Sequence, residues 1–172
     1  MNSRDVHLLQ KFNSAFAEEN WDELSNLLDP KIFRSIESKE LIAFPVLAKV
    51  AQILTTEDSV VPNDIKIGCL KCLGNSCFNT SNENLEEMER SSSYPFDSHF
   101  PYEGVVGWTS NVITTFHCKF DSDLSDEKLE ILRLSIQFLC NLFTFACKDS
   151  NFPDQDNVLQ FLYDTDLKDV IM

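Results

Sequence analysis

Apolar residues recur every three or four positions along most of the chain, and this spacing places them on one face of a helix. The first such series is Val6, Leu9, Phe12 and Phe16. No segment shows the sustained alternation of apolar and polar residues that is typical of a half-buried strand. The pattern therefore predicts an all-α protein.

Capping residues and prolines indicate where the helices begin and end. Asn20, followed by Glu23, predicts the start of a second helix that ends before Pro30. Asn63 or Asp64 is the expected N-cap of a later helix. The acidic turn at 121–126 is expected to cap the helix that comes after it. The further helices are expected over residues 45–54, 65–78, 82–90, 105–118, 128–147 and 157–172.

Residues 91–104 differ from the rest of the chain because they combine two prolines with several aromatic side chains. This composition predicts a long loop inserted between helices. Its aromatic residues would either dock a partner protein or fold back over the helices. These residues are Tyr94, Phe96, Phe100 and Tyr102.

Two segments of the chain align without a gap: residues 65–77 match residues 131–143. The alignment pairs Asn75 with Asn141, which lies 66 residues later. Helical repeats of about 40–47 residues are typical of armadillo and HEAT proteins. The insertion at 91–104 and the acidic turn account for the longer spacing here. We therefore expect helical repeats over 38–172, preceded by an N-terminal helical cap at 1–37.

Short strings in these segments resemble the armadillo-repeat family. The string LKCLGNSC at 70–77 resembles the third helix of an armadillo repeat, and Phe44-Pro45 resembles the apolar-Pro pair that leads its second helix. The strings CLGNSC at 72–77 and IQFLCN at 136–141 are similar to strings in the N-terminal part of the ataxin-10 family. The resemblance covers about residues 38–165.

The resemblance implies a fold, a function and a location. The implied fold is an armadillo-like α-solenoid, a right-handed superhelix of short helical repeats. The implied function is that of a non-enzymatic scaffold for protein–protein interactions, located in the cytoplasm and linked to neuronal survival, neurite growth and cytokinesis. Some armadillo solenoids regulate GTPases or act as their exchange factors, which is the alternative function.

The same resemblance implies a partner-binding role for Asn75 and Asn141. In armadillo proteins the equivalent asparagine faces a concave groove and bonds the backbone of an extended peptide, since a carboxamide offers both a donor and an acceptor. The alternative is that each asparagine bonds its own solenoid. Lys71 and Gln137 stand four residues earlier, where importin-like repeats carry tryptophan. They are further partner-binding candidates, although this difference argues against binding of basic localisation signals.

The charge of the chain narrows the classes of partner. The 172 residues include 28 acidic and 14 basic side chains, which gives a net charge of -14. Such a surface repels phosphate backbones and anionic lipid headgroups, so we expect no nucleic-acid and no membrane partner. Basic or extended segments of other proteins are compatible with it. The apolar end at 170–172 predicts self-association or packing on a continuation of the chain.

No motif predicts catalysis or a bound cofactor. The three histidines, His7, His99 and His117, belong to no recognisable catalytic motif, and the glycines form no phosphate-binding loop. We therefore expect a non-enzyme that needs no cofactor.

The cysteines and aspartates do not predict a metal site either. Cys69 and Cys72 would supply two ligands, and no second pair occurs at zinc-finger spacing. The cysteines are instead expected to pack between helices as small apolar residues. The aspartates of the turn at 121–126 lack the glycine of a calcium loop.

Overall fold

The computed structural model describes residues 1–33, 42, 44–57, 60–77, 102–117 and 124–142. Within these residues all regular secondary structure is helical, which confirms the predicted class. The helices expected over 82–90 and 157–172, most of the loop at 91–104 and the apolar end at 170–172 lie outside the described residues. None of the helices in the described part combines the length and apolar character needed to cross a bilayer.

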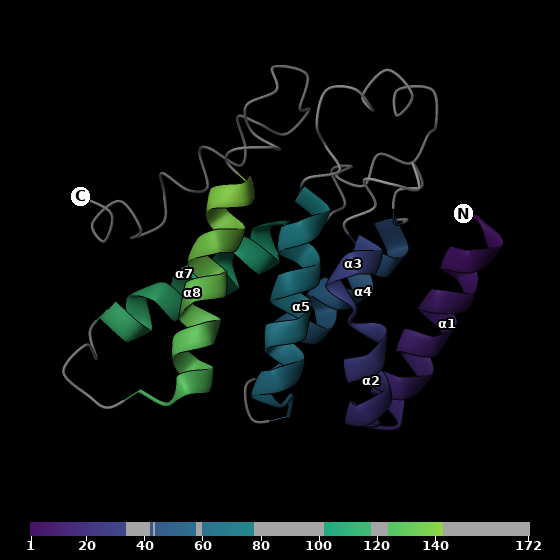
Figure 1. Ribbon diagram of the computed structural model, residues 1–172, viewed down its shortest axis with the longest axis horizontal. Coiled ribbons are helices and arrows are strands. Elements are labelled where there is room, and N and C mark those ends of the chain that lie inside the picture. The colour runs from purple at the N-terminus through teal and green to yellow at the C-terminus, as the bar shows by residue number, and fades with distance from the viewer. Residues whose placement is uncertain (34–41, 43, 58–59, 78–101, 118–123, 143–172) are drawn as a thin grey trace, which may run out of the picture.

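The described helices are arranged along the chain from the N-terminus in the order shown in Figure 1. They are α1 (Ser3–Ala17), α2 (Trp21–Leu27), α3 (Pro30–Phe33), α4 (Phe44–Thr55), α5 (Asn63–Ser76), α7 (Tyr102–His117) and α8 (Asp126–Asn141).

The predicted cap at Asn20 and the predicted capping turn before α8 are confirmed by hydrogen bonds. The side-chain oxygen of Asn20 accepts from the Glu23 amide at 3.1 Å and so caps α2. Ser125, in the predicted capping turn, accepts from the Lys128 amide at 3.4 Å and caps α8. Helix α2 ends before Pro30, as predicted, although this proline also opens the short helix α3.

The predicted start of α5 is wrong. Its N-cap residue is Pro62, which makes no side-chain capping bond, and the helix begins at Asn63. Proline suits a helix start because its ring fixes φ and the missing amide hydrogen is not needed there. The first turn is closed when the Lys66 amide donates to the Pro62 carbonyl at 3.1 Å.

Three further expectations are corrected by the structure. Helix α7 begins at Tyr102, so the last three residues of the expected loop are helical. Helix α8 begins at Asp126, two residues before the expected start. Val6 is 38% exposed and is not part of the buried face of α1, on which Phe12 is fully buried.

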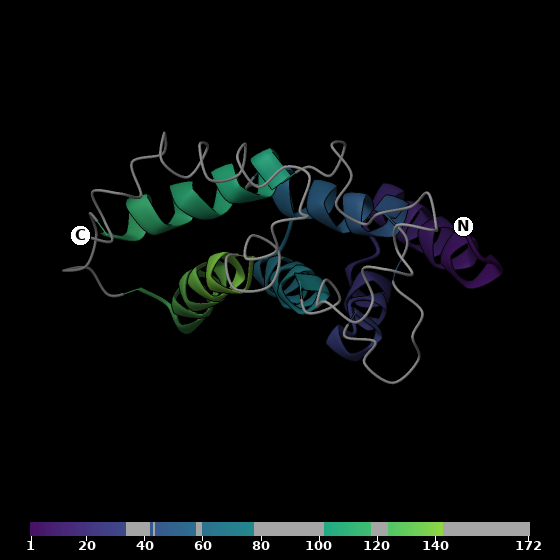
Figure 2. The same cartoon turned by 90° about the horizontal axis from the view of Figure 1, so that it is seen from above.

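The helices form two layers, which Figure 2 shows from above. One layer is the row α1, α4 and α7, and the other is the row of α2 with α3, then α5, then α8. Contacts between α1 and α2, between α4 and α5, and between α7 and α8 join the layers. The described helices therefore form three pairs side by side. The N-terminal helices make the first pair, and the expected boundary at residues 37 and 38 lies outside the described residues.

A single core of apolar side chains fills the space between the layers. It draws on each of the described helices, which is expected because an amphipathic helix is stable only when its apolar face is covered. The largest fully buried side chains are Phe12, Phe33, Phe138, Leu24, Ile42, Leu47, Ile53, Leu54, Ile65, Leu70 and Leu73.

Candidate functional site

Asn75 and Asn141 each tie their helix to the preceding helix of the same row. The amide nitrogen Nδ2 of Asn75 donates to the Pro30 carbonyl of α3 at 2.9 Å. Nδ2 of Asn141 donates to the Gly74 carbonyl of α5 at 3.2 Å. A carbonyl oxygen can only accept, so these bonds set which end of each carboxamide faces the neighbouring helix. Each nitrogen thus bonds a neighbouring helix of the same chain.

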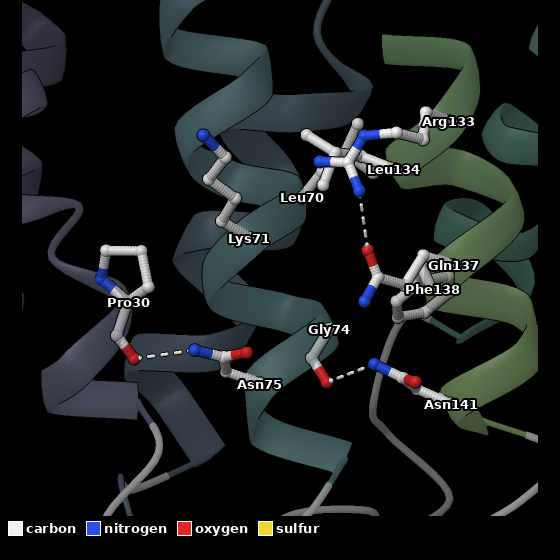
Figure 3. A pocket seen from close by; sticks show the side chains of 10 residues that line it. All are labelled: Pro30, Leu70, Lys71, Gly74, Asn75, Arg133, Leu134, Gln137, Phe138 and Asn141. Carbon is white, nitrogen blue, oxygen red and sulfur yellow. Dashed lines mark hydrogen bonds between the residues drawn. The ribbon is translucent and has the colours of Figure 1, made fainter. Parts of the chain in front are cut away.

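The carboxamide oxygens are oriented by the same bonds. Because the nitrogen of each asparagine faces the preceding helix, its oxygen is directed elsewhere, as Figure 3 shows. Neither oxygen accepts a hydrogen bond from the described residues, and both asparagines are partly exposed. Two acceptors of fixed orientation are therefore left over at equivalent points of α5 and α8.

A groove of about 200 Å³ lies between α5 and α8. All four partner-binding candidates line it, and the view into the groove in Figure 3 shows them together. The complete lining is Pro30, Leu70, Lys71, Gly74, Asn75, Arg133, Leu134, Gln137, Phe138 and Asn141.

Helix geometry explains why the four candidates share one groove. Lys71 precedes Asn75 by four residues, and Gln137 precedes Asn141 by four, so each pair lies one turn apart on one face. The two helices lie side by side with these positions facing the same space. Between them the buried side chains Leu70, Leu134 and Phe138 supply an apolar floor beneath a polar rim.

Arg133 is a rim residue that the sequence pattern did not identify. Its Nε and Nη2 atoms donate to the two carboxylate oxygens of Glu130, each at 2.7 Å, and its Nη1 donates to Oε1 of Gln137 at 3.1 Å. In the first copy of the repeat Ile67 occupies the equivalent position, so the alignment gave no reason to select an arginine. Its spacing could have identified it, because Arg133 lies one helical turn before Gln137 on the same face of the helix.

The charged side chains of Lys71 and Arg133 both contact the carboxylate of Glu130. The Lys71 ammonium lies 3.8 Å from Oε1 of Glu130, the same oxygen that Nη2 of Arg133 contacts. The hydrogen bond from Arg133 lowers the pKa of Glu130, and Glu130 raises the pKa of Arg133 in turn. The Glu130 carboxylate therefore lies between two basic side chains, one from each helix.

The lining of the groove combines amide, cationic and apolar side chains. Among the described lining residues there is no histidine, cysteine, serine or carboxylate that could act as a nucleophile or general base. The groove is also smaller than the roughly 300–1,000 Å³ of typical small-molecule sites. What it offers is amide donors and acceptors, two cations and an apolar floor.

The cysteines do not form a second site within the described residues. Cys69, Cys72 and Cys77 are buried as free thiols, which confirms the expected packing role for these three. Burial raises the pKa of the Cys69 and Cys72 thiols, so both stay protonated at neutral pH. Cys140, by contrast, is exposed. No group of three metal-ligating side chains occurs among the described residues.

Comparisons of the chain with protein-family models, with curated proteins and with solved structures give no match. The interpretation of the groove therefore depends on the residues of this chain alone.

Proposed function

We propose that the chain is a non-enzymatic interaction scaffold of the armadillo type, and that the groove between α5 and α8 holds an extended segment of a partner protein. Three stacked helix pairs and an asparagine at the same position of α5 and α8 support this proposal. The observation that carries it is the orientation of Asn75 and Asn141, whose nitrogens donate to neighbouring helices while their oxygens accept no hydrogen bond from the described residues.

An extended peptide has the hydrogen-bonding groups that this rim can complement. Its backbone amides and carbonyls are unpaired along both edges and need partners when water is excluded. The oxygens of Asn75 and Asn141 would accept from peptide amides. Gln137 uses Oε1 for Arg133, which leaves its Nε2 to donate to a peptide carbonyl. Because the side chains are already held in place, little conformational entropy is lost on binding.

The resemblance to the ataxin-10 family extends the proposal to a cellular role. On that basis the scaffold would be of the ataxin-10 type, would act in the cytoplasm and would contribute to neuronal survival, neurite growth and cytokinesis. The strings at 72–77 and 136–141 that carry this resemblance lie on α5 and α8 and include both asparagines.

Peptide display on the full chain tests the binding role. Eight-residue peptides selected from a random library would be labelled with a fluorophore, and their affinity would be measured by fluorescence anisotropy. The double substitution Asn75→Ala with Asn141→Ala is expected to weaken binding at least tenfold, since it removes both acceptors. Asn111→Ala, an identical change at an exposed position of α7, is the matched control and should leave the affinity unchanged.

Two outcomes of this experiment would overturn the proposal. If the double variant keeps the helical circular dichroism of the parent chain and binds the selected peptides with unchanged affinity, the groove is not the binding site. A library that yields no peptide above the background of the double variant would also reject the proposal.

A further inference from the structure

The charged residues that line the groove have the opposite sign to the chain as a whole. The chain has a net charge of -14, yet the only charged side chains among the described lining residues are Lys71 and Arg133. Lys71 comes from α5 and Arg133 from α8, so the two cations approach the groove from its two walls. Both are substantially solvent-exposed, with 44% and 58% of the side-chain surface accessible.

Glu130 holds these cations in place without neutralising both. Its carboxylate takes two hydrogen bonds from Arg133 and lies within ion-pair distance of Lys71, but it is outside the groove lining. Two positive charges therefore share one negative charge, which leaves an excess of one positive charge at this end of the groove. A carboxylate of a ligand would neutralise this excess charge. It would also accept hydrogen bonds from Arg133 and Lys71, whose side chains are already oriented.

Remote acidic residues do not cancel this local preference. At physiological ionic strength the Debye length is about 8 Å, so exposed charges farther away are largely screened. A carboxylate that contacts Lys71 or Arg133 directly is screened much less. The acidic remainder of the surface instead discourages acidic peptides from binding elsewhere, whereas it attracts basic peptides to many places.

We infer that the groove selects an extended segment with an acidic side chain, whose carboxylate contacts Arg133 and Lys71 while the backbone bonds Asn75 and Asn141. This inference rests on the proposed function and adds the class of ligand to it. The net charge of the chain is compatible with basic segments, but the local charges of the groove favour acidic ones.

The spacing of the rim also indicates where the acidic residue belongs. Arg133 precedes Asn141 by eight residues of helix, which corresponds to about 12 Å along the helix axis. An extended peptide advances about 3.3 Å per residue. The acidic residue is therefore expected about three or four positions from the residue that the asparagines bind.

Three sets of eight-residue peptides test this inference on the full chain. The sets share one backbone sequence and differ only at two positions, which carry Asp or Glu, Asn or Gln, or Lys or Arg. By fluorescence anisotropy at physiological salt, the acidic set is expected to bind about tenfold more tightly than the neutral set. Combining Lys71→Gln with Arg133→Gln should abolish the difference in affinity between the acidic and the neutral set.

Two further variants sharpen the test. Lys11→Gln with Lys128→Gln makes the same change in net charge at exposed positions outside the groove, and should preserve the acidic preference. Glu130→Gln removes the carboxylate that competes for Arg133, and should tighten binding of the acidic set severalfold.

The outcomes separate this inference from the proposed function. If all three sets bind equally, and binding is lost in the Asn75→Ala and Asn141→Ala double variant, the acidic preference is wrong and the groove function stands. Tighter binding of the basic set would likewise overturn the inference. Binding that does not depend on the asparagines would reject both.

Discussion

Helices α5 and α8 carry matching sequence positions but differ in the helices that lie beside them. Leu70 of α5 is 1% exposed, whereas Ile136, the equivalent residue of α8, is 46% exposed. Helix α5 has α3 on one side and α8 on the other, while α8 is the last described helix of that row. Burial at this position therefore depends on whether another helix packs on the far side, and not on how apolar the side chain is.

The asparagines behave differently from these apolar residues. Asn75 and Asn141 both donate to the preceding helix, so neither bond depends on the presence of a later helix in the row. The polar link of the repeat is thus present at both helices, although the apolar cover is present at only one. Stability and binding can consequently be separated by substitutions at the two kinds of position.

The largest difference in the free energy of unfolding is expected between the variants Leu70→Ala and Ile136→Ala. Leu70→Ala leaves a cavity in a covered site and should lower the free energy of unfolding by about 2–5 kcal/mol. Ile136→Ala removes surface that is already half exposed and should change it by less than about 1 kcal/mol. Urea unfolding followed by circular dichroism measures both. Equal losses would show that Ile136 is covered in solution as Leu70 is.

The two asparagine links should contribute similar amounts. Asn75→Ala and Asn141→Ala each remove one hydrogen bond and leave a partly buried carbonyl without its partner. Each is expected to lower the free energy of unfolding by about 0.5–1.5 kcal/mol. Hydrogen exchange should locate the effect of Asn141→Ala in α8 and the end of α5. An unchanged exchange pattern there would show that the bond to Gly74 contributes nothing.

The two glycines of α5 are expected to respond to alanine with opposite signs. A Cβ at Gly68 would lie 3.1 Å from Cβ and Cδ1 of Leu28, a buried residue that must then shift. This crowding should exceed the gain in helix propensity, for a net loss of about 1 kcal/mol in the free energy of unfolding. A Cβ at Gly74 meets its nearest atom, Nδ2 of Asn141, at 3.7 Å, an ordinary contact.

Gly74→Ala should therefore raise the free energy of unfolding by up to about 1 kcal/mol through helix propensity alone. Thermal melts of the two variants provide the measurement. A loss of stability in Gly74→Ala would mean that α5 and α8 approach each other more closely than the structure shows.

The smallest effect concerns the charge cluster at Glu130. Because Arg133 lowers the pKa of this carboxyl in the folded state, its contribution to stability is present above the unfolded pKa of about 4.3 and is lost as the pH falls through the lower folded value. The free energies of unfolding of the parent chain and of Glu130→Gln should differ by less than about 1 kcal/mol at pH 7. The difference should begin to shrink as the pH falls below the unfolded pKa of about 4.3 and should vanish below the lower folded pKa. A difference that is constant with pH would show that charge is not its cause.

Much of the helical layout could be predicted from local signals. The cap at Asn20 and the capping turn that contains Ser125 were recognisable because a capping bond spans only three residues, so its partners are close together in the sequence. The start of α5 was predicted wrongly because the polar residues after Pro62 suggested a cap, whereas Pro62 is the N-cap residue and the helix begins at Asn63. Such competing local signals cannot be ranked by pattern alone.

The site was predictable in part. The repeat identified Asn75 and Asn141, and helical spacing added Lys71 and Gln137, but nothing in the pattern showed that all four line one groove. Arg133 stayed unrecognised because the equivalent position of the first copy is Ile67. Glu130 stayed unrecognised because its role depends on a contact with Lys71, about sixty residues away along the chain.

The sequence by itself therefore determined the helical class, several helix ends and an asparagine repeated 66 residues apart. Only the tertiary structure decided which atoms those asparagines bond, which apolar positions are covered and where two cations share one carboxylate. The physical reason is the separation along the chain over which each kind of interaction acts. Propensity, capping and amphipathic spacing act over one or two turns, whereas burial and charge coupling depend on which distant segments pack side by side.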